Sequence, residues 1–204
     1  MDKLGLEQIN DTDLWAAFQS GSRKAFIVIY EKYIRVLYEY GSKLSPNHEL
    51  VEDCIQELYI DLWLKKDQLG STHNIKAYLF TSLKRRLTRQ LSRISQQKQK
   101  IEENYGVEFA LEVSQETKML EELQEKHWKN RLNEALQGLT PRQREFIFLK
   151  YYQKLSYDEV ARVMDLKKKG VYKLADRAIK ALKSSVLVTT VILLLLTVWE
   201  VFTS

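Results

Sequence analysis

Apolar residues recur at spacings of three and four along most of the chain, which is the period of an α-helix with one buried face. The stretch SRKAFIVIYEKYIRVLYEYGSKL is a long example, and its apolar face consists of Phe26, Ile29, Tyr30, Tyr33 and Leu37. The stretches ELVEDCIQELYIDLWLKK and IKAYLFTSLKRRLTRQLSRI repeat the pattern. Long alternating patterns typical of β-strands are absent from the sequence, which has only two prolines and seven glycines. We therefore predict an all-α protein.

The predicted helices group into two small domains. Residues 10–95 contain four of them and form the first domain. Residues 96–127 are polar and mixed, which predicts a linker. Residues 128–183 form the second domain, and residues 184–204 are an apolar tail. The apolar content of 45% is sufficient for two cores.

Residues that favour helix starts mark the expected boundaries. Asp11 or Thr12 is expected to cap the first helix, and Asn47 the third. Ser156, followed three residues later by Glu159, has the capping-box pattern.

The stretch LSYDEVARVMDLKKKGVYKLADRAIKAL joins two short helices through a tight turn. The apolar side of its second helix is expected to pack on the first helix, and it consists of Val171, Leu174, Ala175, Ala178 and Leu182. The opposite side must face solvent and carries Lys168, Lys169, Tyr172, Lys173, Asp176 and Arg177. This is a helix-turn-helix pattern, in which lysines near the start of the second helix neutralise phosphates and later side chains meet base edges in the major groove. The alternative is an ordinary helical hairpin with a solvated face.

The net charge of +5 is modest, but basic residues are concentrated in two places. Residues 83–100 contain seven basic side chains and no acidic ones, and residues 165–183 contain seven basic and two acidic ones. A single basic run is as often a solvated helix face as a binding surface. Two separate runs, each on a predicted helix, favour a polyanionic partner.

Several classes of chemistry are not indicated by the sequence. The lone Cys54 cannot form an internal disulfide and fits a reducing cytoplasm. The three histidines lack ligand spacing, so no metal site is predicted. Neither a paired nucleophile and base nor a phosphate-binding loop is evident, so we predict neither an enzyme nor a cofactor. The first residues have no apolar core of the length that a signal peptide requires.

Two motif sets in the same order resemble a known family. Residues 128–183 resemble the C-terminal domain of bacterial sigma factors, which reads the −35 promoter element. SGSRKAFIVIYEKY, VEDCIQELYIDLWLKK and NIKAYLFTSLKRR resemble their first conserved domain. Having only these two domains resembles the extracytoplasmic-function (ECF) group. In the turn of the second domain, Asp165 and Lys167 replace the Gly and the Ser or Thr cap that the family commonly has.

The resemblance implies sites in the first domain as well. EDCIQELYIDLW resembles the helix that binds the clamp of core RNA polymerase, which assigns polymerase binding to Asp53, Gln56, Glu57 and Asp61. The loop KKDQLGSTHN corresponds to the one that captures a flipped base of the −10 element. The helix after this loop resembles the strand-separating helix, and it carries Tyr78, Phe80, Lys84, Arg85, Arg86 and Arg89. Aromatic rings stack on unpaired bases and basic side chains hold the backbone, which suits DNA melting. Tyr78 would serve equally well as a core residue.

The tail presents two alternatives. Residues 186–202 are almost entirely apolar, and basic residues precede them, which predicts a membrane tether that leaves both domains in the cytoplasm. The alternative is a helix buried on the protein itself or on a partner such as an anti-sigma protein.

These patterns predict a sigma factor with core RNA polymerase and promoter DNA as partners. Two other hypotheses remain from the sequence. One is a stand-alone helix-turn-helix regulator, and the other is a tail-anchored helical adaptor whose basic faces meet anionic lipid.

Overall fold

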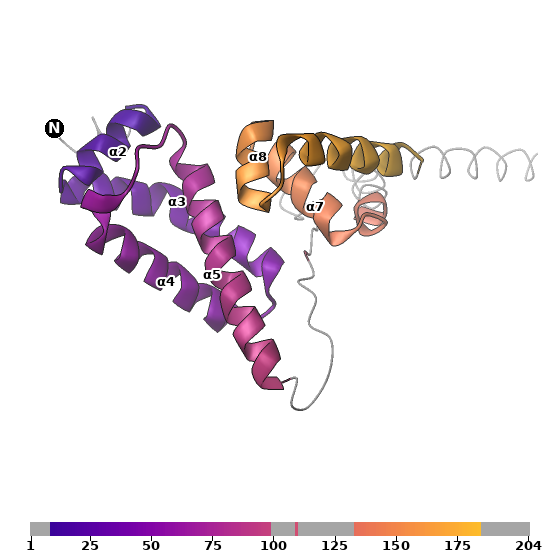
Figure 1. Ribbon diagram of the computed structural model, residues 1–204, viewed down its shortest axis with the longest axis horizontal. Coiled ribbons are helices and arrows are strands. Elements are labelled where there is room, and N and C mark those ends of the chain that lie inside the picture. Colours follow the sequence, from indigo (N-terminus) through magenta and orange to yellow (C-terminus); the bar gives the residue numbers. More distant parts are fainter. Residues whose placement is uncertain (1–8, 99–108, 110–132, 185–204) are drawn as a thin grey trace, which may run out of the picture. The chain divides into compact units, whose positions relative to one another are not determined.

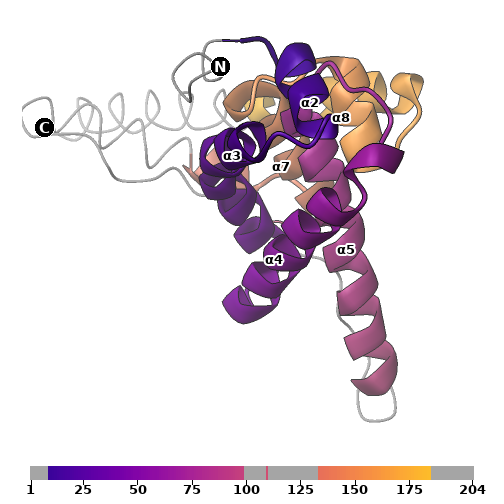
Figure 2. The same cartoon turned by 90° about the vertical axis from the view of Figure 1, so that its left-hand side faces the viewer.

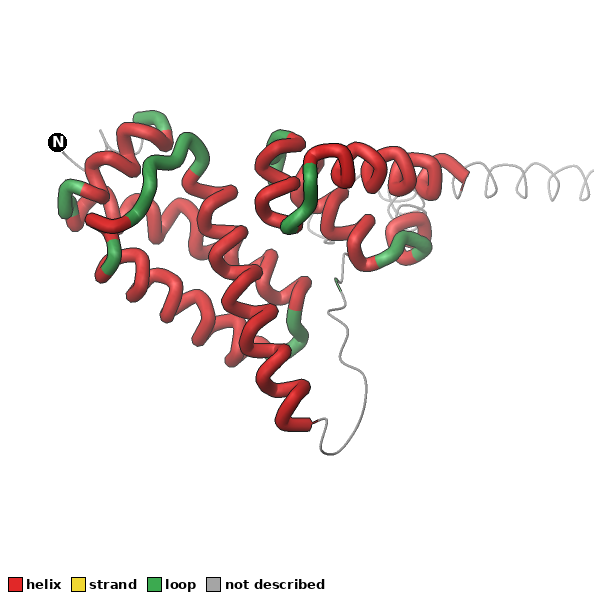
Figure 3. Tube along the Cα trace, viewed as in Figure 1, coloured by secondary structure: helices red, strands yellow, loops and turns green. Residues whose placement is uncertain are grey.

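The computed structural model describes residues 9–98, Phe109 and residues 133–184. Within these ranges every regular element is a helix (Figure 3), which confirms the predicted all-α class. The chain divides into two compact units, with the main boundary between Glu108 and Phe109. None of the helices described has both the length and the apolar character needed to cross a bilayer. The apolar tail over 186–202 lies outside the described residues.

The first unit contains four α-helices and a short 3₁₀ turn. The helices are α2 (Asp11–Gln19), α3 (Arg23–Leu44), α4 (His48–Leu64) and α5 (Ile75–Lys98), and the turn is η1 (Lys66–Gln68). Helices α3, α4 and α5 each pack on the other two, and α5 runs alongside its neighbours in Figures 1 and 2. Close approach of α3 and α4 requires Gly41, because a Cβ atom there would lie 2.5 Å from Cγ1 of Val51.

The core of this unit follows the helical period of the sequence. Its largest fully buried side chains are Trp15, Tyr40, Phe18, Phe80, Leu14, Ile29, Leu37, Ile75 and Leu79. Cys54 is buried, and burial raises the pKa of its thiol to about 11. The thiol is therefore protonated at neutral pH and acts as a small core residue.

The start of α2 differs from the prediction. Asn10 is the N-cap, and its side chain accepts a hydrogen bond from the backbone N–H of Asp13 at 2.9 Å. Asp11 instead has longer-range partners: its carboxylate accepts from the Tyr33 hydroxyl at 2.9 Å and from the N–H of Ile75, the first residue of α5, at 2.8 Å. Capping of α4 by Asn47 is confirmed. Asp11 was misassigned because its distant partners, α3 and α5, become neighbours only in the folded chain.

The second unit is built from short helices. They are a helix over 133–137, α7 (Pro141–Ile147), the π-helical segment η2 (Phe148–Tyr152), α8 (Tyr157–Met164) and a helix over 168–184. The predicted capping box of α8 is confirmed, because the Ser156 N–H donates to the Glu159 carboxylate at 2.7 Å and the Glu159 N–H donates to the Ser156 hydroxyl at 3.3 Å.

Parts of the segment predicted as a linker belong to the two units. Helix α5 continues to Lys98, three residues beyond the predicted boundary. Phe109 is buried, and its ring lies 5.7 Å from that of Phe148 in the second unit. The other residues of 96–127 lie outside the described ranges.

Two turns of the second unit place a residue with a side chain in the left-handed backbone region. Lys154, before α8, has φ +58°, and Asp165, after α8, has φ +52°. Asp165 occupies the turn position where a Gly was expected from the resemblance, and Asp tolerates this conformation better than most residues. Lys167 then provides the first carbonyl of the next helix, accepting from the N–H of Gly170 at 2.7 Å.

We expect Lys154→Gly to raise the free energy of unfolding of the second unit by about 1 kcal/mol. Glycine removes a left-handed strain of roughly 1–2 kcal/mol, and the larger entropy of the unfolded chain offsets part of this gain. Chemical denaturation of the purified variant measures the change. Asp165→Gly is the matched control and should gain less, because Asp is less strained. A loss of stability in Lys154→Gly would show that the turn is not strained.

Candidate functional site

The exposed face of the helix over 168–184 is the one that the sequence predicts. All six outward side chains from Lys168 to Arg177 are exposed, whereas Val171, Ala175 and Ala178 are buried. Lys169, Lys173 and Arg177 recur every four residues and therefore form a basic stripe along the helix. The other charges on this face are paired locally, because Lys168 bonds Asp158 of α8 and Asp176 bonds Lys180, each at 2.9 Å.

The Tyr172 side chain packs against Tyr157 of α8. Its ring stacks on that of Tyr157, with centroids 4.6 Å apart and planes 18° apart. The ammonium group of Lys150 lies 4.8 Å from the centroid of the Tyr157 ring. Tyr172 nevertheless stays 49% exposed. The stack fixes the orientation of an exposed aromatic side chain beside the basic stripe.

In the first unit, the loop before α5 is attached to α2. Trp15 donates its indole N–H to the carbonyl of Gly70 at 2.9 Å, and Gln19 donates its amide to the carbonyl of Leu69 at 2.5 Å. A third link joins Thr12 and His73, whose side chains hydrogen-bond at 3.3 Å. Hydrogen bonds from a helix fifty or more residues earlier in the chain therefore fix the shape of the loop over 69–74.

Helix α5 presents an aromatic and basic side. Tyr78 is half-buried, with its ring 5.0 Å from that of Trp15, while Arg85 and Arg89 are exposed. Spacings of seven and four place these three residues on one side of the helix. Lys84 is half-buried and lies about 100° around the helix from Arg85.

The Arg86 side chain forms hydrogen bonds with acidic residues of α4. Its guanidinium donates to the Glu57 carboxylate of α4 at 2.9 Å and to the Asp61 carboxylate at 2.5 Å. Lys65 adds an ion pair to Asp61 at 3.0 Å. Hydrogen bonds from Arg86 and Lys65 hold the pKa of the Asp61 carboxyl below its usual value.

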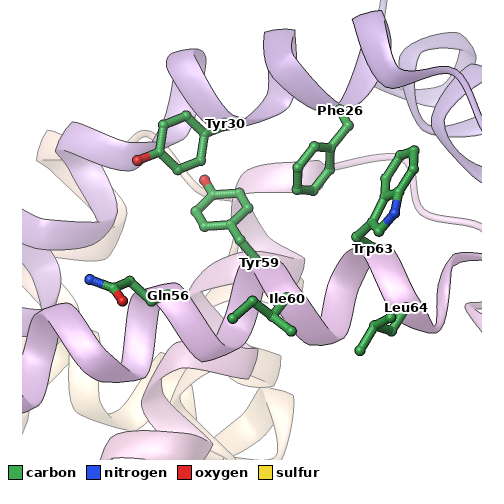
Figure 4. A pocket seen from close by; sticks show the side chains of 7 residues that line it. All are labelled: Phe26, Tyr30, Gln56, Tyr59, Ile60, Trp63 and Leu64. Carbon is green, nitrogen blue, oxygen red and sulfur yellow. The ribbon is translucent and has the colours of Figure 1, made fainter.

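An apolar groove lies beside the polar side of α4. Its walls come from α3 and α4, and it encloses about 430 Å³ (Figure 4); the lining residues are Phe26, Tyr30, Gln56, Tyr59, Ile60, Trp63 and Leu64. Ile60 is 59% exposed and Leu64 is 68% exposed. The buried hydroxyl of Tyr59 has no hydrogen-bond partner among the described residues. Asp53, Gln56 and Glu57 are exposed on the same helix.

Comparison with known proteins agrees with this arrangement. The family model described as sigma-70 region 2 matches residues 29–97, and the one described as sigma-70 region 4 matches residues 129–182. Together these matches span more than half of the chain, one in each unit. The chain is an ECF sigma factor of the sigma-70 family.

Individual relatives are similar over most of their length. The ECF RNA polymerase sigma factor SigK of Mycobacterium ulcerans is 28% identical over 145 residues, which are 69% of this sigma factor and 74% of SigK. The sigma factor RpoE of Bartonella quintana, solved with the anti-sigma factor NepR, superimposes with a TM-score of 0.59 at 24% identity, covering 80% of this chain and 97% of RpoE. CnrH, solved with the cytosolic domain of CnrY, gives a TM-score of 0.55 at 21% identity, covering 85% and 95%. The two structures show a shared fold.

One predicted site residue of the sigma factor lies in the core. Phe80 is fully buried, and its ring stacks on that of Tyr40 with centroids 4.7 Å apart. It precedes the buried residues Leu83 and Leu87 by three and seven positions, so it belongs to the inner face of α5. We therefore withdraw Phe80 from the residues expected to stack on bases.

Other features of the sigma factor were missed by sequence reasoning. The attachment of the loop by Trp15 and Gln19 was missed because both partners are backbone carbonyls, which leave no residue signature. The groove residues Ile60 and Leu64 were missed, although apolar positions on the outer side of an amphipathic helix are a usable signal. Within the described ranges, no group of three or more His, Cys, Asp or Glu is arranged to hold a metal ion.

Proposed function

We propose that this sigma factor binds core RNA polymerase, recognises the −10 and −35 elements of promoters and opens the duplex. The observation that carries the proposal is the presence of both sigma-70 regions, one on each unit, each with an exposed basic face. A sigma factor of this group needs both regions, because binding at two separated elements defines a promoter more sharply than one contact does.

The second unit is the proposed reader of the −35 element. The helix over 168–184 would enter the major groove with its basic stripe (Lys169, Lys173 and Arg177) toward the DNA. Tyr172, held by Tyr157, would add an oriented aromatic contact. Lys168 is paired locally, and its hydrogen bond with Asp158 raises the pKa of its ammonium group.

Helix α5 and the loop over 69–74 are the proposed opening apparatus. Tyr78 would stack on an unpaired base, and Arg85 and Arg89 would hold the phosphates of the separated strand. The loop would receive a flipped base, whose binding energy offsets the cost of unstacking. The bonds from Trp15 and Gln19 would hold the loop backbone in one shape before the base is bound.

The polymerase contact is assigned to α4. Asp53, Gln56, Glu57 and Asp61 would supply polar contacts, and the adjoining groove would supply the apolar ones. Gln56 belongs to both sets, so the two surfaces are continuous. The unpaired hydroxyl of Tyr59 favours a partner that brings a hydrogen-bond acceptor into the groove. Two relatives of similar fold were solved with NepR and CnrY, and we propose that an anti-sigma protein competes for these surfaces.

We expect Gln19→Ala to slow promoter opening several-fold without changing polymerase affinity. The variant loses one hydrogen bond to the loop, which is worth roughly 1 kcal/mol or about a fivefold change. Permanganate reactivity of unpaired thymines measures opening over time. Ser20→Ala is the matched control, because the Ser20 hydroxyl donates to the carbonyl of Ala17 at the end of its own helix. Equal opening rates for both variants would contradict the role of the loop attachment.

Run-off transcription tests the proposed function as a whole. The purified chain is added to core polymerase of its own bacterium on a library of promoter fragments. Initiation at defined sites is expected only when the chain is present, and the enriched fragments give the recognised sequence. Operator binding without polymerase-dependent initiation would overturn the proposal and leave a stand-alone regulator.

A further inference from the structure

Arg86 belongs to the predicted DNA-melting set, yet the structure pairs its side chain with α4. Its two terminal nitrogens bond two carboxylates one helical turn apart, Glu57 at 2.9 Å and Asp61 at 2.5 Å. The Arg86 side chain is only 25% exposed. A planar guanidinium suits two acceptors at a fixed spacing better than an ammonium group does.

The neighbouring arginines are placed differently. Arg85 is exposed and lies about 100° around α5 from Arg86, and Arg89 is exposed on the side of Arg85 and Tyr78. Helix α5 therefore divides its basic residues between two directions. Arg85 and Arg89 face solvent, and Arg86 contacts the surface of α4.

We propose that Arg86 is a positioning residue for polymerase binding and not a contact for promoter phosphates. It would hold the carboxylates of Glu57 and Asp61 in one arrangement on the surface that α4 offers to core polymerase. This inference rests on the proposed function, because it assumes that α4 binds polymerase.

Whether removing Arg86 raises or lowers the affinity for polymerase distinguishes positioning from an effect of net charge. Glu57 and Asp61 are four residues apart, and like charges at that spacing repel each other. Removing Arg86 makes the surface more negative, so attraction to a basic partner by net charge alone would strengthen binding. Loss of orientation would weaken it, because two unrestrained carboxylates must be ordered again when the complex forms. A weaker complex therefore indicates positioning and a stronger one indicates net charge.

The test compares Arg86→Ala with Arg85→Ala in the full chain. We expect Arg86→Ala to weaken binding to core polymerase by about tenfold and Arg85→Ala to change it by less than twofold, measured by fluorescence titration. The saturated holoenzymes are then titrated with fork-junction DNA carrying a promoter selected by run-off transcription. Arg85→Ala should lower the slope of log affinity against log salt by about 0.7 to 0.9, as expected for one lost phosphate contact, and Arg86→Ala should leave that slope unchanged.

Testing Arg86→Ala in a chain that already lacks its two carboxylate partners separates positioning from general damage to the fold. If Arg86 acts through its two partners, Arg86→Ala should have almost no further effect in a chain that already carries Glu57→Gln and Asp61→Asn. Arg86→Lys should recover only part of the affinity, because one ammonium group cannot reproduce the fork. Circular dichroism confirms folding of each variant.

The possible results are distinguishable. A wild-type chain that does not bind core polymerase would overturn the proposed function itself. A wild-type chain that binds, with a reduced salt slope or stronger polymerase binding in Arg86→Ala, would overturn the assignment of Arg86 alone. A full tenfold loss that persists in the background lacking both carboxylates would also overturn it.

Discussion

Replacing Ile60 with Asp should weaken binding of the sigma factor to core polymerase by about 100-fold. Ile60 is 59% exposed and lines the apolar groove, so the unbound protein tolerates a polar residue there (Figure 4). In the complex, an unpaired carboxylate would be buried against apolar surface at a cost of roughly 3 kcal/mol. The effect therefore separates binding from folding.

The matched control for this variant is Ile27→Asp. Ile27 is an exposed isoleucine of α3, at 45%, that does not line the groove. We expect its polymerase affinity to stay within about twofold of wild type. Fluorescence titration with core polymerase measures both variants, and thermal unfolding checks their stability. Similar losses in the two variants, or none in either, would remove the groove from the polymerase contact.

Replacing Lys173 and Arg177 with Ala together should reduce affinity of the holoenzyme for its −35 element by about 100-fold. The two side chains lie one turn apart on the basic stripe, and each contact to a base or phosphate is worth about 1–3 kcal/mol. If both contact phosphates, the slope of log affinity against log salt should fall by about 1.8. Loss of affinity with relaxed sequence preference would instead assign base contacts.

Lys180→Ala is the control for the recognition helix. Lys180 lies on the same helix, is exposed and pairs with Asp176 at 2.9 Å. Its removal lowers the net charge by one unit without removing a residue of the stripe. We expect a change of less than about threefold in DNA binding. An effect as large as that of the double variant would mean that affinity depends on overall charge and not on the stripe.

Sequence reasoning was most successful where the relevant interactions are local. The capping box of Ser156 and Glu159 and the N-cap Asn47 each depend on residues within three positions, so the pattern alone predicted them. The outward face of the helix over 168–184 followed from the helical period, because apolar residues on one side fix what must lie on the other. Phe80 was assigned to DNA from the resemblance and not from the helical period, which places it on the inner face of α5 with Leu83 and Leu87.

Arg86 shows more clearly what could not be predicted from the sequence. In the sequence it stands next to Arg85 in one basic run, and nothing in the run distinguishes the two residues. Their separation depends on the rotation of α5 against α4, which packing of Leu83 and Leu87 sets. Their residue type predicted that both arginines bind a polyanion. In the structure, however, Arg86 bonds two carboxylates of the protein itself.

The sequence by itself determined the all-helical class, the local caps of α4 and α8 and the outward face of the helix over 168–184. These depend on backbone periodicity and on partners a few residues away. Tertiary structure alone decided that Trp15 and Gln19 hold the loop over 69–74, that α3 and α4 leave an apolar groove and that Arg86 faces α4. The physical reason is that these features join residues from different helices, whose rotation and spacing depend on packing of the whole unit.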